Sequence, residues 1–107
     1  MTGQDHIKQA DQCLNMAELR AGIDRLDRSL VKLLSERQRY IERAAEIKAR
    51  AAEIRDEARI ADVLAKVTAE AERSGLDVVI AGAVWTTLME QCIALEMREF
   101  ERRQRAR

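Results

Sequence analysis

The chain has 107 residues, of which 47% are hydrophobic and 36% are charged, with four glycines and no proline. This length fits one domain, and the composition favours long helices because proline breaks a helix and glycine weakens one. The 19 basic and 19 acidic residues balance to a net charge of zero, so we expect neither a nucleic-acid partner nor a membrane surface as partner.

Targeting and redox signals are weak. No apolar run approaches the roughly 20 residues that span a bilayer, and residues 1–12 lack the apolar core of a signal peptide. Cys13 and Cys92 are too few and too far apart for a disulfide framework or a metal motif, so we expect reduced thiols and no metal site. The chain is therefore expected to be cytoplasmic.

The N-terminal segment differs from the rest of the chain. Residues 1–14 are polar and aperiodic, which predicts a flexible tail before a helical domain at 15–107. His6 lies in this tail without partner residues, so a tail residue is favoured over a metal ligand or a catalytic group. Met16 opens the patterned region and could be the natural start.

The first helix is predicted to run from Asn15 to about Ala52. Asn15 and Glu18 have the spacing of a capping box. Apolar residues then recur at intervals of mostly three and four: Leu19, Ile23, Leu26, Leu30, Leu33, Tyr40, Ile41, Ala44 and Ile47. Such a helix is about 55 Å long, too long for the rest of this chain to cover. A second copy of the same helix is the expected cover, as in a coiled-coil-like dimer.

Two further helices are predicted after a break at 53–56. The second spans about 57–73 and ends at Gly75 in a left-handed conformation, and Asp77 then caps a third over about 78–103. Their apolar faces carry Ile60, Val63, Leu64 and Val67, and Val84, Trp85, Leu88, Met89, Cys92, Ile93, Met97 and Phe100. The predicted fold class is all-α, with three helices and a long first one.

Basic residues interrupt the apolar stripe of the first helix. Arg37 and Lys48 are eleven positions apart, so they differ by only about 20° around the axis. One buried cation could extend its head to water, but two at one azimuth suggest an anion pocket, with a solvated face as the alternative. Arg20 lies about 100° and about 25 Å from Arg37, so it could reach that pocket only from an antiparallel partner helix.

Glu96 is a similar anomaly on the third helix, four positions after Cys92 on the apolar stripe. A carboxyl group buried there can stay protonated and donate a hydrogen bond. The alternative is a glutamate at the rim, paired with Arg98 or Arg103.

Charges also gather where the second helix begins. Arg55, Asp56 and Arg59 stand at this helix start, which suits a carboxylate or hydroxyl ligand. Ordinary capping and surface charge are the alternative.

These placements together resemble one family. The residues that carry the resemblance are Leu19-Arg20, Ile23-Asp24, Leu26-Asp27, Glu36-Arg37, Lys48, Arg55-Asp56, Arg59 and Gly75-Leu76-Asp77. Over about residues 16–100 the chain is similar to the all-α chorismate mutases (AroQ class). The resemblance implies a cofactor-free rearrangement of chorismate to prephenate, in aromatic amino-acid biosynthesis, by an intertwined homodimer.

The resemblance also implies roles for single residues. Arg20 would cross over from the partner subunit, and Arg37 would clamp a substrate carboxylate. Lys48 would contact a carboxylate and the ether oxygen of the breaking bond. Arg59 would support the carboxylate end, and Glu96 would be the second donor to the ether oxygen, where many relatives have glutamine.

Other positions concern the ring of the substrate. Asp56 would sit where the family's backbone amide meets the ring hydroxyl, and Cys92 is serine in some relatives. Ile60 departs from the pattern, because well-known mutases have a glutamate there that binds the C4 hydroxyl, whereas related isochorismate pyruvate lyases have an apolar residue. Three alternatives remain open. Two are enzymes on the same scaffold, the lyase and a 4-amino-4-deoxychorismate mutase. The third, of another class, is a non-catalytic dimerisation or regulatory module in which Arg37 and Lys48 are solvated.

Overall fold

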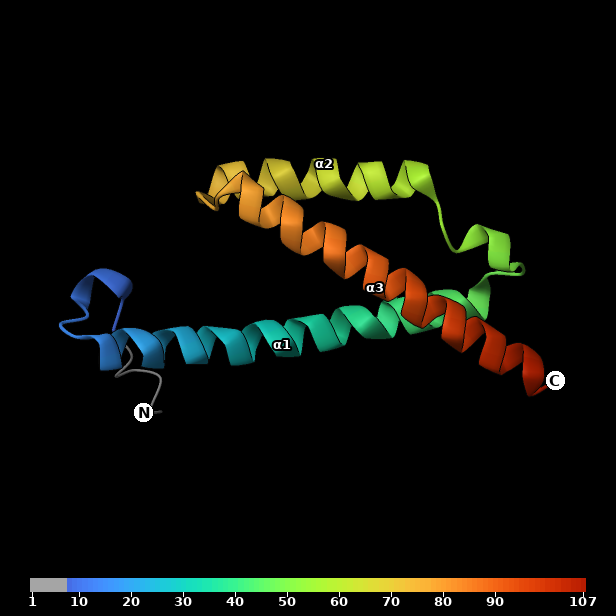
Figure 1. Ribbon diagram of the computed structural model, residues 1–107, viewed down its shortest axis with the longest axis horizontal. Helices are drawn as coiled ribbons and strands as arrows, with labels where there is room; N and C mark the ends of the chain where they lie inside the picture. The colour runs from blue at the N-terminus through green and yellow to red at the C-terminus, as the bar shows by residue number, and fades with distance from the viewer. Residues whose placement is uncertain (1–7) are drawn as a thin grey trace. The chain divides into compact units, whose positions relative to one another are not determined.

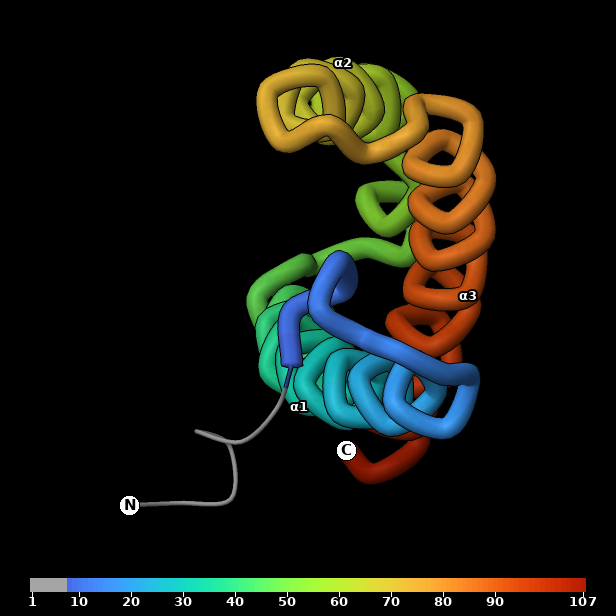
Figure 2. Tube along the Cα trace, turned by 90° about the vertical axis from the view of Figure 1, so that its left-hand side faces the viewer, coloured from blue at the N-terminus to red at the C-terminus, as the bar shows by residue number. Residues whose placement is uncertain are grey.

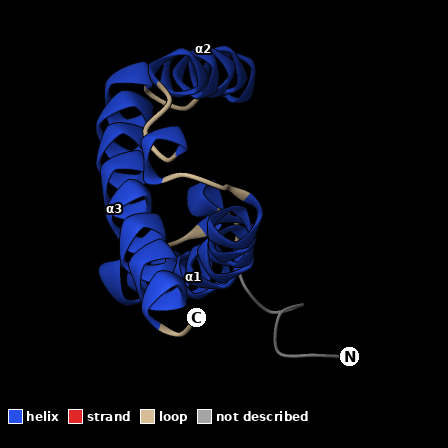
Figure 3. Cartoon of the chain, turned by 90° about the vertical axis from the view of Figure 1, so that its right-hand side faces the viewer, coloured by secondary structure: helices blue, strands red, loops and turns tan. Residues whose placement is uncertain are grey.

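The computed structural model describes residues 8–107, and these contain helices and loops but no strand (Figure 3). Three long helices follow in order: α1 (Met16–Ile47), α2 (Glu57–Ser74) and α3 (Val78–Arg105). Two short 3-10 turns, η2 (Ala10–Gln12) and η3 (Ala51–Glu53), precede α1 and α2. The predicted all-α fold with a long first helix is confirmed.

The start of α1 follows from local side-chain chemistry. The backbone N–H of Glu18 donates to Asn15 Oδ1 at 2.9 Å, as predicted for the cap. The Glu18 carboxylate reaches one residue further back than a capping box requires, accepting from the Leu14 N–H at 2.7 Å and pairing with Lys8. The hydrogen bond with Lys8, followed by that from Leu14, lowers the pKa of Glu18. His6 and the rest of 1–7 lie outside the described residues.

The end of α1 differs from the prediction, because the helix stops at Ile47 and not near Ala52. In a continuous helix Ala45 and Ile54 would lie about 13 Å apart along the axis. In the structure both are buried in one cluster with Phe100, which requires the chain to turn back after Lys48. The turn at Arg50 is extended, with φ −136° and ψ 143°. This stretch holds neither glycine nor proline, so the local sequence carries no stop signal.

The α2–α3 connection is as predicted (Figure 1). Gly75 adopts φ 78°, and the Leu76 N–H donates back to the Ala71 carbonyl at 2.9 Å, closing a Schellman-type end. The Asp77 carboxylate then accepts from the Val79 N–H at 2.7 Å and begins α3. Figure 2 views α2 nearly along its axis and shows α3 leaving it at this turn.

The described chain divides into two compact units, one ending at Arg37 and one from Gln38 to Arg107. In the second unit a small core forms where Ala45, Ile54 and Phe100 meet, with Ile93 and Met97 packed against it. In the first unit the apolar stripe of α1 stays exposed: Ile23 51%, Leu26 51%, Leu30 55% and Leu33 60%. A single chain thus leaves an unusual amount of apolar side chain uncovered.

One correction concerns hydropathy. Among the described residues α3 is long and apolar enough to cross a membrane by length and composition alone, although Glu90 and other polar residues interrupt its apolar run. The core helix of a soluble protein passes the same test. Only 11% of the apolar window is buried, so this part of α3 also has surface available to a partner.

Candidate active site

The centre of the candidate site is a contact between Lys48, just past the end of α1, and Glu96 in the middle of α3. Lys48 Nζ lies 2.7 Å from Glu96 Oε2, and the two side chains are 26% and 6% exposed. The Lys48 N–H still donates to the Ala44 carbonyl, so this residue keeps its helical position although α1 has ended. Both charges that the sequence placed on apolar stripes therefore meet in one place.

Glu96 is the one buried charged residue of the described chain, at 4% exposure. It pairs with Lys48 and not with Arg98 or Arg103, so the alternative of a rim glutamate is wrong. The contact is an ion pair without the directional geometry of a hydrogen bond, and Oε2 has no hydrogen-bond partner. Such a carboxylate depends on one cation, because a buried charge left alone is strongly destabilising.

The start of α2 supplies the next group of charges. Asp56 caps the helix, its Oδ1 accepting from the Arg59 N–H at 3.0 Å, which is the ordinary capping role. The Arg59 guanidinium pairs with Asp62 at 2.7 Å and is 62% exposed. The hydrogen bond from Lys66, followed by that from Arg59, lowers the pKa of Asp62. Arg59 would have to leave Asp62 to bind a ligand.

Arg55 makes a contact that the sequence did not suggest. Its guanidinium lies 2.5 Å from Glu90 on α3 and 3.4 Å from the neighbouring Glu57. The hydrogen bond to Glu90 is the main cause that raises the pKa of Arg55. Contacts between residues 35 positions apart leave no trace in helical periodicity, so no sequence signal could have found this pair.

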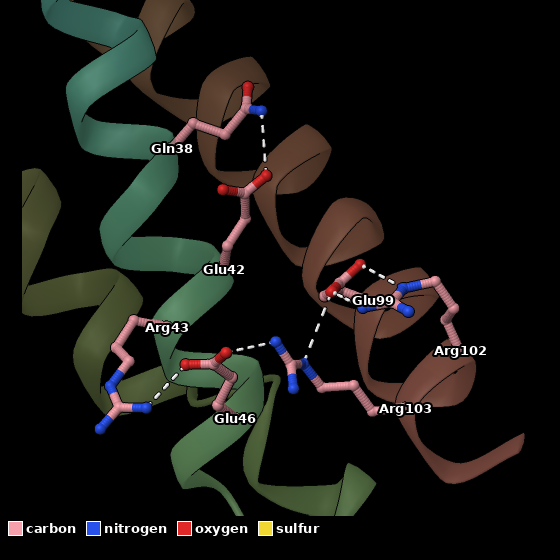
Figure 4. A network of polar contacts seen from close by, with 7 residues as sticks. All are labelled: Gln38, Glu42, Arg43, Glu46, Glu99, Arg102 and Arg103. Carbon is pink, nitrogen blue, oxygen red and sulfur yellow. Dashed lines mark hydrogen bonds and ion pairs between the residues drawn. The ribbon is translucent and has the colours of Figure 1, made fainter. Parts of the chain in front are cut away.

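A second network that was not predicted joins the end of α1 to the last turns of α3 (Figure 4). Glu46 accepts from both Arg43 and Arg103, and Glu99 accepts from Arg102. The hydrogen bond from Arg43 and the charge of Arg103 lower the pKa of Glu46. A polar cavity of about 240 Å³ lies beside this network and is lined by Ala45, Glu46, Lys48, Phe100, Arg102, Arg103, Gln104, Ala106 and Arg107.

Comparison with known proteins identifies the family. Residues 19–97 match the profile of chorismate mutase type II. The chain belongs to the chorismate mutase type II family. It is also 29% identical over 92 residues to isochorismate pyruvate lyase of Pseudomonas aeruginosa. The aligned region covers 86% of this chain and 91% of that protein. These matches assign the chain to a family of enzymes, but they do not decide between the mutase and the lyase reaction.

The matched range contains every residue that the sequence singled out for the site. Arg20 and Arg37 both lie on α1 in the first unit, where Arg20 is exposed and Arg37 is half-buried. They are 17 positions apart, which is about 25 Å along the helix. One helix cannot bring both to a single small ligand, so the family role predicted for Arg20 still requires a second chain.

The remaining predicted site residues are Cys92 on α3 and Ile60 on α2. Cys92 is half-buried one helical turn before Glu96, and it forms no disulfide with Cys13. Ile60 is half-buried in the first turn of α2. Among the described residues no group of three or more His, Cys, Asp or Glu side chains could hold a metal ion.

Proposed function

We propose that the chain is a chorismate mutase, which rearranges chorismate to prephenate without a cofactor in aromatic amino-acid biosynthesis. The observation that carries the proposal is the buried pair of Lys48 and Glu96 in a chain of this family. It places a cation and a carboxyl group 2.7 Å apart, with the carboxyl group almost fully withdrawn from solvent. Two such groups can act on one oxygen atom of a substrate.

The reaction is an intramolecular pericyclic rearrangement of a dianion. The enzyme must hold the substrate in a compact conformer, and arginines can do so by binding its carboxylates in bidentate geometry. Arg37 and Arg59 would serve the site from one subunit and Arg20 from the other. Asp56 would fix the backbone that meets the ring hydroxyl, while Cys92 and Ile60 would line the ring.

Negative charge builds on the ether oxygen as the carbon–oxygen bond breaks. Lys48 would stabilise that charge in the transition state more than in the ground state, which is what lowers a barrier. Glu96 would add a second hydrogen bond, but only when protonated, because a carboxylate repels the developing charge.

A homodimer is part of the proposal. The four leucine and isoleucine side chains of α1 named above are each at least half exposed in the single chain. Burial of apolar area is the main favourable term in association. A second copy of α1 offers the same stripe, so an isologous interface between the long helices would cover it.

Isochorismate pyruvate lyase is the second candidate activity. Two observations favour it: the apolar Ile60 at the position discussed above, and the similarity to the lyase of Pseudomonas aeruginosa. The same cationic pocket would promote a related pericyclic elimination. A 4-amino-4-deoxychorismate mutase would also tolerate a changed C4 region.

Product analysis tests these assignments. Purified protein is incubated separately with chorismate, isochorismate and 4-amino-4-deoxychorismate, and the products are identified by mass spectrometry. We expect prephenate from chorismate as the fastest reaction. Release of pyruvate from isochorismate at a higher kcat/KM would assign the lyase. No turnover of any of the three would instead favour a dimerisation or regulatory module.

A further inference from the structure

The connector from Lys48 to Arg55 carries Lys48 of the central Lys48–Glu96 pair, yet it contains little regular secondary structure. It holds one 3-10 turn of three residues, Ala51–Glu53. Its backbone hydrogen bonds are local, from Lys48 to Ala44, from Glu53 to Arg50 and from Ile54 to Ala51. None of these bonds fixes the connector against α3, so its placement depends on side chains.

Ile54 is the apolar anchor of the connector. It is 4% exposed and packs with Ala45 and Phe100. Apolar contact is non-directional, however, so it can hold the connector near α3 without fixing where the Lys48 ammonium lies. Charge pairs with short contacts supply the direction that apolar packing lacks.

Three ion pairs tie this stretch of chain to α3. Glu46 pairs with Arg103, Lys48 with Glu96 and Arg55 with Glu90. Their partners on α3 are seven and six positions apart, or about 10 and 9 Å along the helix. The central pair therefore has one further ion pair on each side of it, just before the connector begins and where it ends (Figure 4 shows the Glu46–Arg103 pair).

We propose that Glu46–Arg103 and Arg55–Glu90 are positioning ion pairs, which hold Lys48 against Glu96 for the reaction. The inference rests on the proposed function and names four positioning residues for it. They act through Lys48 and do not touch the substrate. Arg55 and Glu90 are 45% and 52% exposed, so their pair contributes little to stability and its removal should leave the fold intact.

Steady-state kinetics of Glu90→Gln and Arg55→Gln test the proposal. Either change removes one charge of the pair, and Glu90→Gln also keeps the length of the side chain. We expect kcat to fall about fivefold and KM to change less than about twofold, because a displaced Lys48 stabilises the transition state less while the substrate is still bound. Arg103→Gln, which removes the partner of Glu46 just before the connector, should give the same pattern.

Two further variants separate positioning from a general loss of charge. The double exchange of Arg55→Glu with Glu90→Arg restores the pair with reversed polarity and should recover most of kcat. Glu70→Gln is the matched control, because it breaks the Arg73–Glu70 pair inside α2. Its kcat should equal that of the wild type. An equal loss in Glu70→Gln, or no recovery in the double exchange, would overturn the proposal.

Hydrogen exchange gives a readout that does not need turnover. In Glu90→Gln the backbone amides of Lys48–Arg55 should exchange faster, while those in the middle of α3 should not. If exchange and kcat both stay at wild-type values, the pairs do not position the connector. If the wild type converts none of the substrates, the proposed function fails, and the exchange rates alone decide whether the pairs hold the connector.

Discussion

At the scale of single residues, the Lys48–Glu96 pair combines a structural cost with a chemical use. A buried carboxylate loses hydration, and one cation 2.7 Å away compensates only in part. Replacing such a pair with apolar residues is often neutral or stabilising in proteins. Stability alone therefore does not explain the pair, whereas the proposed reaction, which would develop negative charge beside it, gives it a use.

Lys48→Ala and Arg37→Ala should each lower kcat/KM by at least about a hundredfold, because loss of a preorganised charge donor typically raises the barrier by about 3 kcal/mol. Helical circular dichroism at room temperature should remain that of the wild type, although Lys48→Ala, which leaves Glu96 without its cation, should unfold at a lower temperature. Arg73→Ala, which removes an exposed cation paired locally with Glu70, is the control and should leave kcat/KM unchanged. Near-normal activity in either of the first two variants would exclude the site described here.

Glu96→Gln tests whether the carboxyl group acts as a donor. In the proposed mechanism only a protonated Glu96 can donate to the ether oxygen, so wild-type activity should decline as the pH rises. Glutamine keeps the shape and supplies an amide donor that does not titrate. The variant should therefore show a flatter alkaline limb and equal or higher kcat above neutral pH.

The measurement is a pH–rate profile of both proteins between about pH 5 and 9. Superimposable profiles would mean that Glu96 is not the donor and that Lys48 acts on the ether oxygen alone. A circular dichroism spectrum at each pH shows whether the fold is retained across the range.

At the scale of elements, the sequence predicted what depends on neighbours along one helix. Caps at Asn15 and Asp77 and the turn at Gly75 are set by residues within a few positions, and the structure confirms them. The predicted end of α1 near Ala52 was wrong, because contact with Phe100, far along the chain, decides where the helix stops. Periodicity could not pair Lys48 with Glu96, since it gives azimuth on one helix only, and it was the family resemblance that placed both residues at one ether oxygen.

Gly75→Ala tests the turn between α2 and α3. The left-handed conformation, with φ 78°, is strained for any residue with a Cβ, although no atom lies within 4 Å of the added carbon. The variant should lose about 1 kcal/mol of unfolding free energy, measured by denaturation in urea. Gly75→Asn should lose less, because asparagine tolerates this region better. Equal stability of Gly75→Ala and the wild type would show that the turn relaxes.

Acid should weaken the network between α1 and α3. Hydrogen bonds with Arg43 and with Arg102 lower the pKa of Glu46 and of Glu99 from 4.5. A lowered pKa in the folded state gives stability that is complete above about pH 4.5 and is lost as the pH falls through the lowered value. The melting temperature should thus decrease as the pH is lowered from about 4.5, and the decrease should be smaller in Glu46→Gln. An identical decline in both proteins would contradict this assignment.

At the scale of the whole molecule, the second unit has a core and the long helix has an exposed apolar stripe. The sequence predicted this stripe from its spacing, and the length of the helix led to the hypothesis of a second copy. A chain of 107 residues buries little apolar area by itself, so association is a physically reasonable remedy. Light scattering at micromolar concentration should give the mass of a dimer, and a compact monomer would exclude the shared site.

Subunit mixing tests whether Arg20 acts across that interface. Arg20→Ala and Lys48→Ala should each be inactive alone, because every site lacks one essential cation. In a mixed dimer one site receives Lys48 from the first chain and Arg20 from the second, so it is intact, while the other site lacks both. Equal amounts of the two variants should therefore recover about a quarter of wild-type activity after random exchange of subunits. If Arg20 acted within its own subunit, each mixed dimer would still lack a complete site, and no activity would return although native mass spectrometry shows that the subunits have exchanged.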